Sequence, residues 1–193
     1  MGGACPVSAA NHSAVPRPCT ASGAIAAATA GRMLNRLVCD AGIEPVLKSW
    51  MLIDNHDIPR IATQLPKLSQ RRLAQVLQFT LPGAPNIYYG SELGMTGGAD
   101  PENRAPMRWD LARADNPELA WAELLIGLRK QHRALRIGNF RLVEADRLLA
   151  FERYTERPLE TVVVLVNPTD AAITEQVMIA NAGLMDDTPM VDL

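Results

Sequence analysis

The sequence is poor in cysteine. Its three cysteines are Cys5, Cys19 and Cys39, and their spacing matches neither a metal-binding knuckle nor a redox motif. An odd number of cysteines in a loose arrangement favours free thiols in a reducing, cytoplasmic compartment. We therefore expect no metal ion and no cofactor.

Other absences narrow the class of protein. The net charge is −2 and no basic stripe is present, which argues against nucleic acid as a partner. The longest apolar runs fall well short of a membrane span, so no membrane is expected either. The N-terminal residues lack the charged region and long apolar core of a signal peptide. We interpret residues 1–32 as a disordered or unassigned segment.

What is present is a globular balance, with 48% hydrophobic and 21% charged residues. Helical and strand-like patterns alternate along the first two thirds of the chain. This alternation predicts an α/β fold in which parallel strands are joined by crossover helices. The expected order is helix (33–48, broken near Gly42 and Pro45), strand (50–54), helix (69–80, capped by Ser69), strand (86–90) and helix (117–133).

The pattern changes after Gly138. Three strand-like runs follow, at 139–145, 148–154 and 161–167, and residues 173–179 are a candidate fourth. Short turns separate them, which predicts an antiparallel β module. We therefore divide the chain into residues 33–136 and residues 137–193.

A polar cluster follows the first predicted strand, in the stretch WMLIDNHDIPR. Asn55, His56 and Asp57 come directly after the strand, and Ser91 and Glu92 come directly after the next one. In parallel α/β folds, the loops at the carboxyl ends of the strands form the active face. A carboxylate beside an imidazole suits a hydroxyl-rich ligand. A simple Asn/Asp turn with a hydrogen-bonded histidine explains the tripeptide equally well.

Three stretches together resemble the α-amylase family, glycoside hydrolase family 13. They are IDNHDIPR, PGAPNIYYGSELGMTGGADPENRAPMRWD and LIGLRKQHRALRIGNFRL. The similarity is greatest to the maltogenic amylase, neopullulanase and cyclomaltodextrinase branch, over residues 33–193. It implies the C-terminal portion of a (β/α)8 TIM barrel followed by the start of an antiparallel β-sandwich. Residues 50–54 and 86–90 would be barrel strands seven and eight.

The resemblance also implies a function and site residues. Members of the family cleave or transfer α-glucosidic bonds with retention, so a maltooligosaccharide or related α-glucan is the expected substrate. Asp57 matches the third catalytic carboxylate, which holds sugar hydroxyls and favours the oxocarbenium-like form. His56 matches a neighbouring substrate-binding histidine. Arg60 and Arg104 match positions near the glucan cleft.

Two carboxylates that this chemistry needs have no counterpart in the sequence. A retaining glycosidase places a nucleophile and a general acid about 5–5.5 Å apart. The family carries them in GxRxDxxxxV and in a later Glu-bearing motif, and neither occurs here. We therefore expect a fragment of a glycoside hydrolase that is inactive alone. Glu92 is a less favoured candidate for the acid.

Two alternatives stay open. A non-catalytic carbohydrate-binding or structural remnant would keep His56 and Asp57 but perform no chemistry. A metal phosphohydrolase built on the same pair would need further histidines, and His12 and His132 are poorly placed for this role. The pattern makes no prediction about oligomeric state.

Overall fold

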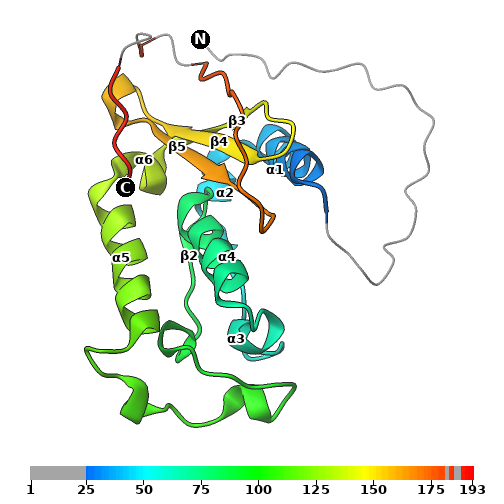
Figure 1. Cartoon of the computed structure of the whole chain (residues 1–193), viewed down its shortest axis with the longest axis vertical. Helices are drawn as coiled ribbons and strands as arrows, with labels where there is room; N and C mark the ends of the chain where they lie inside the picture. Colours follow the sequence, from blue (N-terminus) through cyan, green and yellow to red (C-terminus); the bar gives the residue numbers. More distant parts are fainter. Residues whose placement is uncertain (1–24, 181–182, 185–187) are drawn as a thin grey trace, which may run out of the picture.

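The computed structural model describes residues 25–180, 183–184 and 188–193 (Figure 1). The first element is helix α1, Ala27–Ala41, and the second is α2, Ile43–Leu47. Gly42 separates them with a φ of +79°, which confirms the predicted break at that glycine. Pro45 lies in the first turn of α2, where it is tolerated. Helix α1 thus begins inside the segment predicted to be disordered or unassigned; residues 1–24 lie outside the described part.

Two short parallel strands follow. Strand β1, Trp50–Met51, pairs with β2, Ala84–Pro85. Between them lie helices α3, Ile61–Gln64, and α4, Leu68–Thr80, so the predicted crossover is confirmed. The strand predicted at residues 86–90 is wrong: the pairing stops at Pro85, and residues 86–90 lead into the 3₁₀ turn η1, Ser91–Leu93. The side-chain amide of Gln78 donates to the carbonyls of Met51 and Asn86, at 3.0 and 2.8 Å, where the pairing stops.

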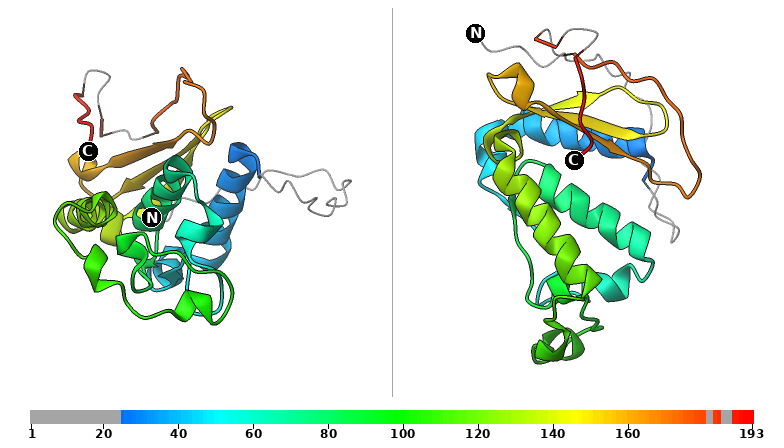
Figure 2. Two further views of the ribbon diagram at one scale, coloured as in Figure 1. Left: turned by 60° about the horizontal axis from the view of Figure 1, so that its bottom comes forward. Right: turned by 60° about the vertical axis from the view of Figure 1, so that its left-hand side comes forward.

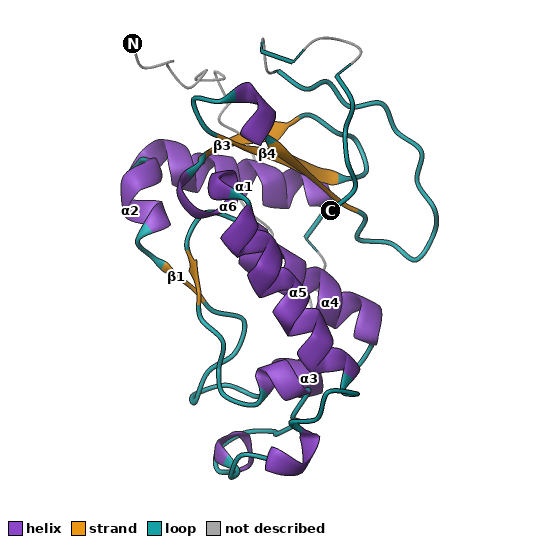
Figure 3. Ribbon diagram, turned by 90° about the vertical axis from the view of Figure 1, so that its left-hand side faces the viewer, coloured by secondary structure: helices purple, strands orange, loops and turns teal. Residues whose placement is uncertain are grey.

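Helices α4 and α5 lie side by side (Figures 1 and 3). Helix α5, Pro117–Gln131, begins after Asn116, whose side chain accepts from the backbone N–H of Glu118 at 2.9 Å. The cap predicted for α4 is wrong, because α4 begins at Leu68 and Ser69 makes no capping hydrogen bond. Short helical turns complete this part of the chain: η2 (Glu102–Arg104), η3 (Trp109–Leu111) and α6 (Arg133–Ile137).

The β module is a three-stranded antiparallel sheet in the order β3-β4-β5. Its strands are Asn139–Val143, Leu149–Tyr154 and Val162–Val166, with the turn η4, Pro158–Glu160, before the last. The three predicted runs are therefore confirmed, whereas residues 173–179 form no strand. Helix α1 packs against this sheet (Figure 2). A Cβ at its buried Gly31 would lie 2.7 Å from Leu142 Cδ1, so glycine permits the close approach.

One hydrophobic core joins the sheet to the helices. Leu81 and Leu135 pack with Phe151 and other strand residues, and side chains of α1 and α4 pack against them. The core therefore contains residues from both sides of the boundary expected between residues 136 and 137. That boundary and the β-sandwich remain predictions, since the described residues form a single antiparallel sheet.

Cys39 lies in α1 and is disulfide-bonded. The expectation of free thiols is therefore wrong for this residue, and Cys5 and Cys19 lie outside the described part of the chain. Within that part, every helix is too short or too polar to cross a bilayer.

Candidate functional site

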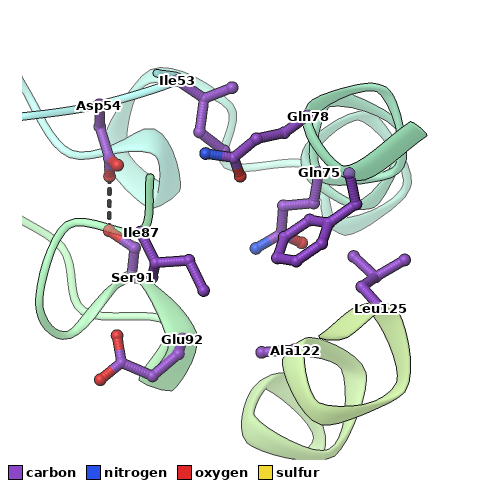
Figure 4. A pocket seen from close by; sticks show the side chains of 10 residues that line it. Ile53, Asp54, Gln75, Gln78, Ile87, Ser91, Glu92, Ala122 and Leu125 are labelled. Atoms are coloured by element: carbon purple, nitrogen blue, oxygen red, sulfur yellow. Dashed lines mark hydrogen bonds between the residues drawn. The ribbon is translucent and has the colours of Figure 1, made fainter. Parts of the chain in front are cut away.

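Asp54 anchors the end of β1. Its side chain is buried, and its Oδ2 accepts a hydrogen bond from Ser91 Oγ at 2.6 Å (Figure 4). The same oxygen accepts from the backbone N–H of Ile61 at 2.9 Å. One carboxylate thus connects the strand end, the start of α3 and the turn after β2. Because Asp54 faces the interior, the exposed chemistry depends on the residues that follow it.

The next residues form a tight turn that presents two side chains to solvent. The Oδ1 of Asn55 accepts from the backbone N–H of Asp57 at 2.8 Å, an Asx turn. The side chains of His56 and Asp57 are 62% and 64% exposed, and His56 Nε2 lies 3.3 Å from Asp57 Oδ1. The turn interpretation and the site interpretation are therefore compatible, because Asn55 shapes the turn that exposes its neighbours.

Arg104 reaches the same turn from the long loop after β2. Its Nε donates to the His56 carbonyl at 3.1 Å, and its Nη2 lies 3.7 Å from Asp57 Oδ1. The side chain is half-exposed and also lies near Asp100. Three of the four predicted site residues, His56, Asp57 and Arg104, thus meet at one exposed place. A cation and an imidazole flank the carboxylate there.

Arg60 is the fourth predicted site residue, and the structure places it elsewhere. It is fully buried, with its guanidinium 4.6 Å from the ring centroids of both Tyr88 and Tyr89. Its Nη1 donates to the carbonyl of Tyr89 at 2.6 Å. In this structure, Arg60 holds the segment after β2 against the start of α3 and is not exposed, while its role near the glucan cleft stays a prediction.

Asn103 is a site residue that the sequence did not reveal. It is fully buried in η2, and its Nδ2 donates to the carbonyls of His56, at 2.8 Å, and Ile58, at 3.1 Å. The one feature of the sequence that pointed to Asn103 is its position directly before Arg104, inside the stretch DPENRAPMRW. A polar residue in a polar loop is normally exposed, however, so its burial was not foreseeable.

A small cavity lies between the end of β1, the turn η1 and helices α4 and α5 (Figure 4). Its volume is about 10 Å³, room for about one water molecule and far too little for a sugar. Glu92 lines this cavity together with Asp54 and Ser91.

Trp121 has Arg72 over its ring at 4.9 Å, whereas Trp109 is largely exposed. Among the residues described, no three His, Cys, Asp or Glu side chains gather where they could hold a metal ion.

Comparison with known proteins shows that the chain is similar to α-amylase-type enzymes. Residues 30–123 match the family described as "Alpha amylase, catalytic domain". The resemblance to the α-amylase family is thereby confirmed over this part of the chain. A cyclomaltodextrinase from a Bacillus species is 38% identical over 127 residues, which are 64% of this chain and 22% of that protein. Neopullulanase 2 from Thermoactinomyces vulgaris is 39% identical over 108 residues, 54% of this chain and 18% of that protein.

Solved structures support a partial barrel. The maltogenic amylase from S. marinus superposes with a TM-score of 0.55 at 39% identity, covering 60% of this chain and 17% of that one. The cyclic α-maltosyl-(1→6)-maltose hydrolase from Arthrobacter globiformis, in complex with maltose, gives 0.66 at 29% identity, with 77% and 34% covered. The chain thus spans about a fifth of the curated relatives and up to a third of these solved structures. The common part carries part of an α/β barrel fold.

Proposed function

We propose that the chain provides part of the α-glucan-binding face of an α-amylase-type glycoside hydrolase, with Asp57 as the carboxylate that holds sugar hydroxyls. The observation that carries this proposal is the exposed Asp57 carboxylate with His56 at 3.3 Å and Arg104 at 3.7 Å, just beyond a parallel strand. The names of the relatives, cyclomaltodextrinase and neopullulanase, point to the same class of substrate.

The chemistry suits a sugar ring. A carboxylate offers about four acceptor positions. His56 and Arg104 both approach Oδ1 of Asp57, which leaves the other carboxylate oxygen available to sugar hydroxyls. Hydrogen bonds from neighbouring hydroxyls to an ionised carboxylate are about twice as strong as neutral ones. The negative charge would also favour a sugar that develops positive charge at its anomeric carbon.

Binding without cleavage is the expected behaviour of this chain alone. Retaining hydrolysis needs two carboxyl groups about 5–5.5 Å apart, one as nucleophile and one as acid. Near Asp57, the described residues offer Asp54, which is buried, and Asp100, which lies near Arg104. Neither replaces the missing pair. This observation favours the second candidate, a carbohydrate-binding protein, for the chain by itself.

Calorimetric titration with maltoheptaose tests the proposal. Asp57→Asn should weaken binding about ten- to a hundredfold, because it removes a charged acceptor worth about 1.5–3 kcal/mol. Asp170→Asn is the matched control. Asp170 is an exposed aspartate in the loop after β5, where it pairs with Lys67, and its substitution should leave binding unchanged. Equal affinity of the wild type and Asp57→Asn would refute the role of Asp57.

Release of reducing ends from maltoheptaose tests the absence of cleavage. We expect no turnover from the purified chain. Turnover that disappears in Asp57→Ala would show that the chain is an enzyme by itself, and that the three-carboxylate requirement does not apply to it.

A further inference from the structure

The turn that carries Asp57 is held by one buried amide. Asn103 Nδ2 donates to the carbonyls of His56 and Ile58, the residues directly before and after Asp57. We propose that Asn103 is the positioning residue for the Asp57 carboxylate: it fixes both flanks of the turn and so sets where the carboxylate points. The proposal rests on the sugar-binding role of Asp57 and deepens it.

The two contacts require an amide. Both N–H groups of the Asn103 side chain lie on one nitrogen, and each meets a carbonyl oxygen. The Oδ1 of Asn103 is buried and has no hydrogen-bond partner. The reverse orientation would place an oxygen against two carbonyl oxygens, so the donor assignment is the only satisfying one. An aspartate has nearly the same shape, but each of its side-chain oxygens would repel the two carbonyl oxygens in either orientation.

Asn103 is itself held firmly, which a clamp requires. Its backbone carbonyl accepts from Tyr88 Oη at 3.3 Å, which connects it to the segment after β2. A Cβ at Gly97 would lie 2.9 Å from Asn103 Cα, so the chain passes directly beside it at a residue without a side chain. The carbonyl of Gly97 accepts from the backbone N–H of Arg60 at 3.0 Å, and its N–H donates to Thr63 Oγ1 at 2.8 Å. The loop is thus fixed to α3 on the far side of the turn.

The exposed partners of Asp57 cannot replace this clamp. His56 and Arg104 are largely or half exposed, so water competes for their contacts with the carboxylate. The side chain of Asn103 is fully buried, and its contacts act on the backbone. Without them, the turn would keep the hydrogen bond from the Asp57 N–H to Asn55 and the contact of the half-exposed Arg104 with the His56 carbonyl.

Amide hydrogen exchange on the full chain tests the clamp without any ligand. In Asn103→Asp, the Asp57 amide should exchange about tenfold faster or more, while the Phe151 amide in β4 keeps its wild-type rate. Asn167→Asp is the matched control: Asn167 also donates to a carbonyl, that of Ala171, but in the loop after β5. It should leave exchange at Asp57 unchanged. In parallel, maltoheptaose should bind about tenfold more weakly to Asn103→Asp and with wild-type affinity to Asn167→Asp.

The outcomes are separable. If maltoheptaose does not bind the wild type, the sugar-binding role fails, and exchange at Asp57 still decides whether the clamp exists. A wild-type exchange rate at Asp57 in Asn103→Asp overturns the proposal. If Asn103→Asp loses protection throughout the molecule, Asn103→Ala, which adds no charge, is measured in its place. Loss of protection in β4 in both variants would assign Asn103 a general structural role and overturn the proposal as well.

Discussion

Single polar residues in this chain act mainly on the backbone. Arg60, Asp54 and Asn103 are all buried, and each has a hydrogen bond to a residue that is distant in sequence. Buried polar groups are costly unless they are paired, so each hydrogen bond among them matters more than an exposed one. The exposed residues of the site, His56 and Asp57, are positioned by this buried layer.

Ser91→Ala tests the buried layer at its best-defined contact. Ser91 Oγ donates to Asp54 Oδ2 at 2.6 Å, and both residues are buried. Removing a donor from a buried carboxylate should lower the free energy of unfolding by about 1.5–3 kcal/mol. Urea denaturation measures it. Ser69→Ala is the control, because Ser69 is exposed and caps no helix, and it should stay within about 0.5 kcal/mol of the wild type. Equal midpoints for the two variants would contradict the prediction.

At the scale of elements, two arginines join the C-terminal end of α4 to its neighbours. Arg129 of α5 donates to the carbonyl of Phe79 at 2.6 Å and to that of Gly83. Arg153 of β4 donates to the carbonyl of Thr80 at 2.7 Å. Carbonyls at the end of a helix lack internal partners and attract cations. Burial lowers the pKa of Arg129 to about 10 and that of Arg153 to about 9, and both remain charged at pH 7.

Arg153→Met tests this junction. Arg153 also donates to the carbonyls of Gly138, at 3.0 Å, and Asn139, at 3.2 Å, so the substitution leaves three acceptors without their donor. We expect a loss of about 3 kcal/mol in the free energy of unfolding. Arg157→Met removes an exposed guanidinium that pairs with Glu160 at 3.3 Å, and it should cost less than about 1 kcal/mol. Thermal denaturation followed by circular dichroism compares them, and a Tm for Arg153→Met as high as that of the control would disprove the junction.

The turn between β3 and β4 should depend on pH. Glu175 accepts hydrogen bonds from the backbone N–H groups of Asp146, Arg147 and Leu148, the last two at 3.2 Å. These hydrogen bonds hold the pKa of Glu175 below its ordinary value of 4.5, and the bond from the Asp146 N–H contributes most. The ionised form therefore stabilises the turn above about pH 4.5, and this contribution is lost as the pH falls through the lowered pKa.

Nuclear magnetic resonance measures this titration directly. The amide resonance of Leu148 should shift as the pH is lowered below 4.5 in the wild type, and Glu175→Gln should abolish the shift. Glu144→Gln, in the loop before the turn, is the control that should retain it. A Leu148 titration that persists in Glu175→Gln would contradict the assignment.

At the scale of the whole molecule, the described residues expose large apolar side chains at several places, two of which involve strands. Trp50 in β1 is 71% exposed, and Leu52, directly after that strand, is also exposed. At the other end, Leu159 and Leu165 are exposed beside a groove of about 590 Å³ formed by α5, the β5 region and residues 188–193. Large exposed apolar patches and open strand edges promote association.

We therefore predict self-association that rises with concentration, measurable by sedimentation velocity. The double substitution Trp50→Gln and Leu52→Gln should reduce it, since it removes the exposed apolar side chains in and directly after β1. Leu159→Gln changes the opposite surface and shows whether the effect is specific to that strand. A wild-type chain that stays monomeric at all concentrations would contradict the prediction.

Much of the fold was predictable from local patterns. The break at Gly42, the alternation of helices and strands, and the three runs of the β module follow from turn residues and hydrophobic periodicity. The strand at 86–90 and the Ser69 cap failed, because Tyr88 and Tyr89 pack on Arg60 and α4 begins without a capping side chain. The meeting of His56, Asp57 and Arg104 followed from the family resemblance. The burial of Arg60 and Asn103 depends on loop packing, which periodicity does not encode.

The clamp on the Asp57 turn has a genetic consequence. The contacts described for this turn come from a single uninterrupted run of the chain, from Asp54 to Arg104. A recombination event whose breakpoints fall outside this run would transfer the carboxylate and its positioning amide together. A breakpoint inside it would combine a turn from one parent with an amide from another. Selection on such hybrids should therefore favour inheritance of this run as one block.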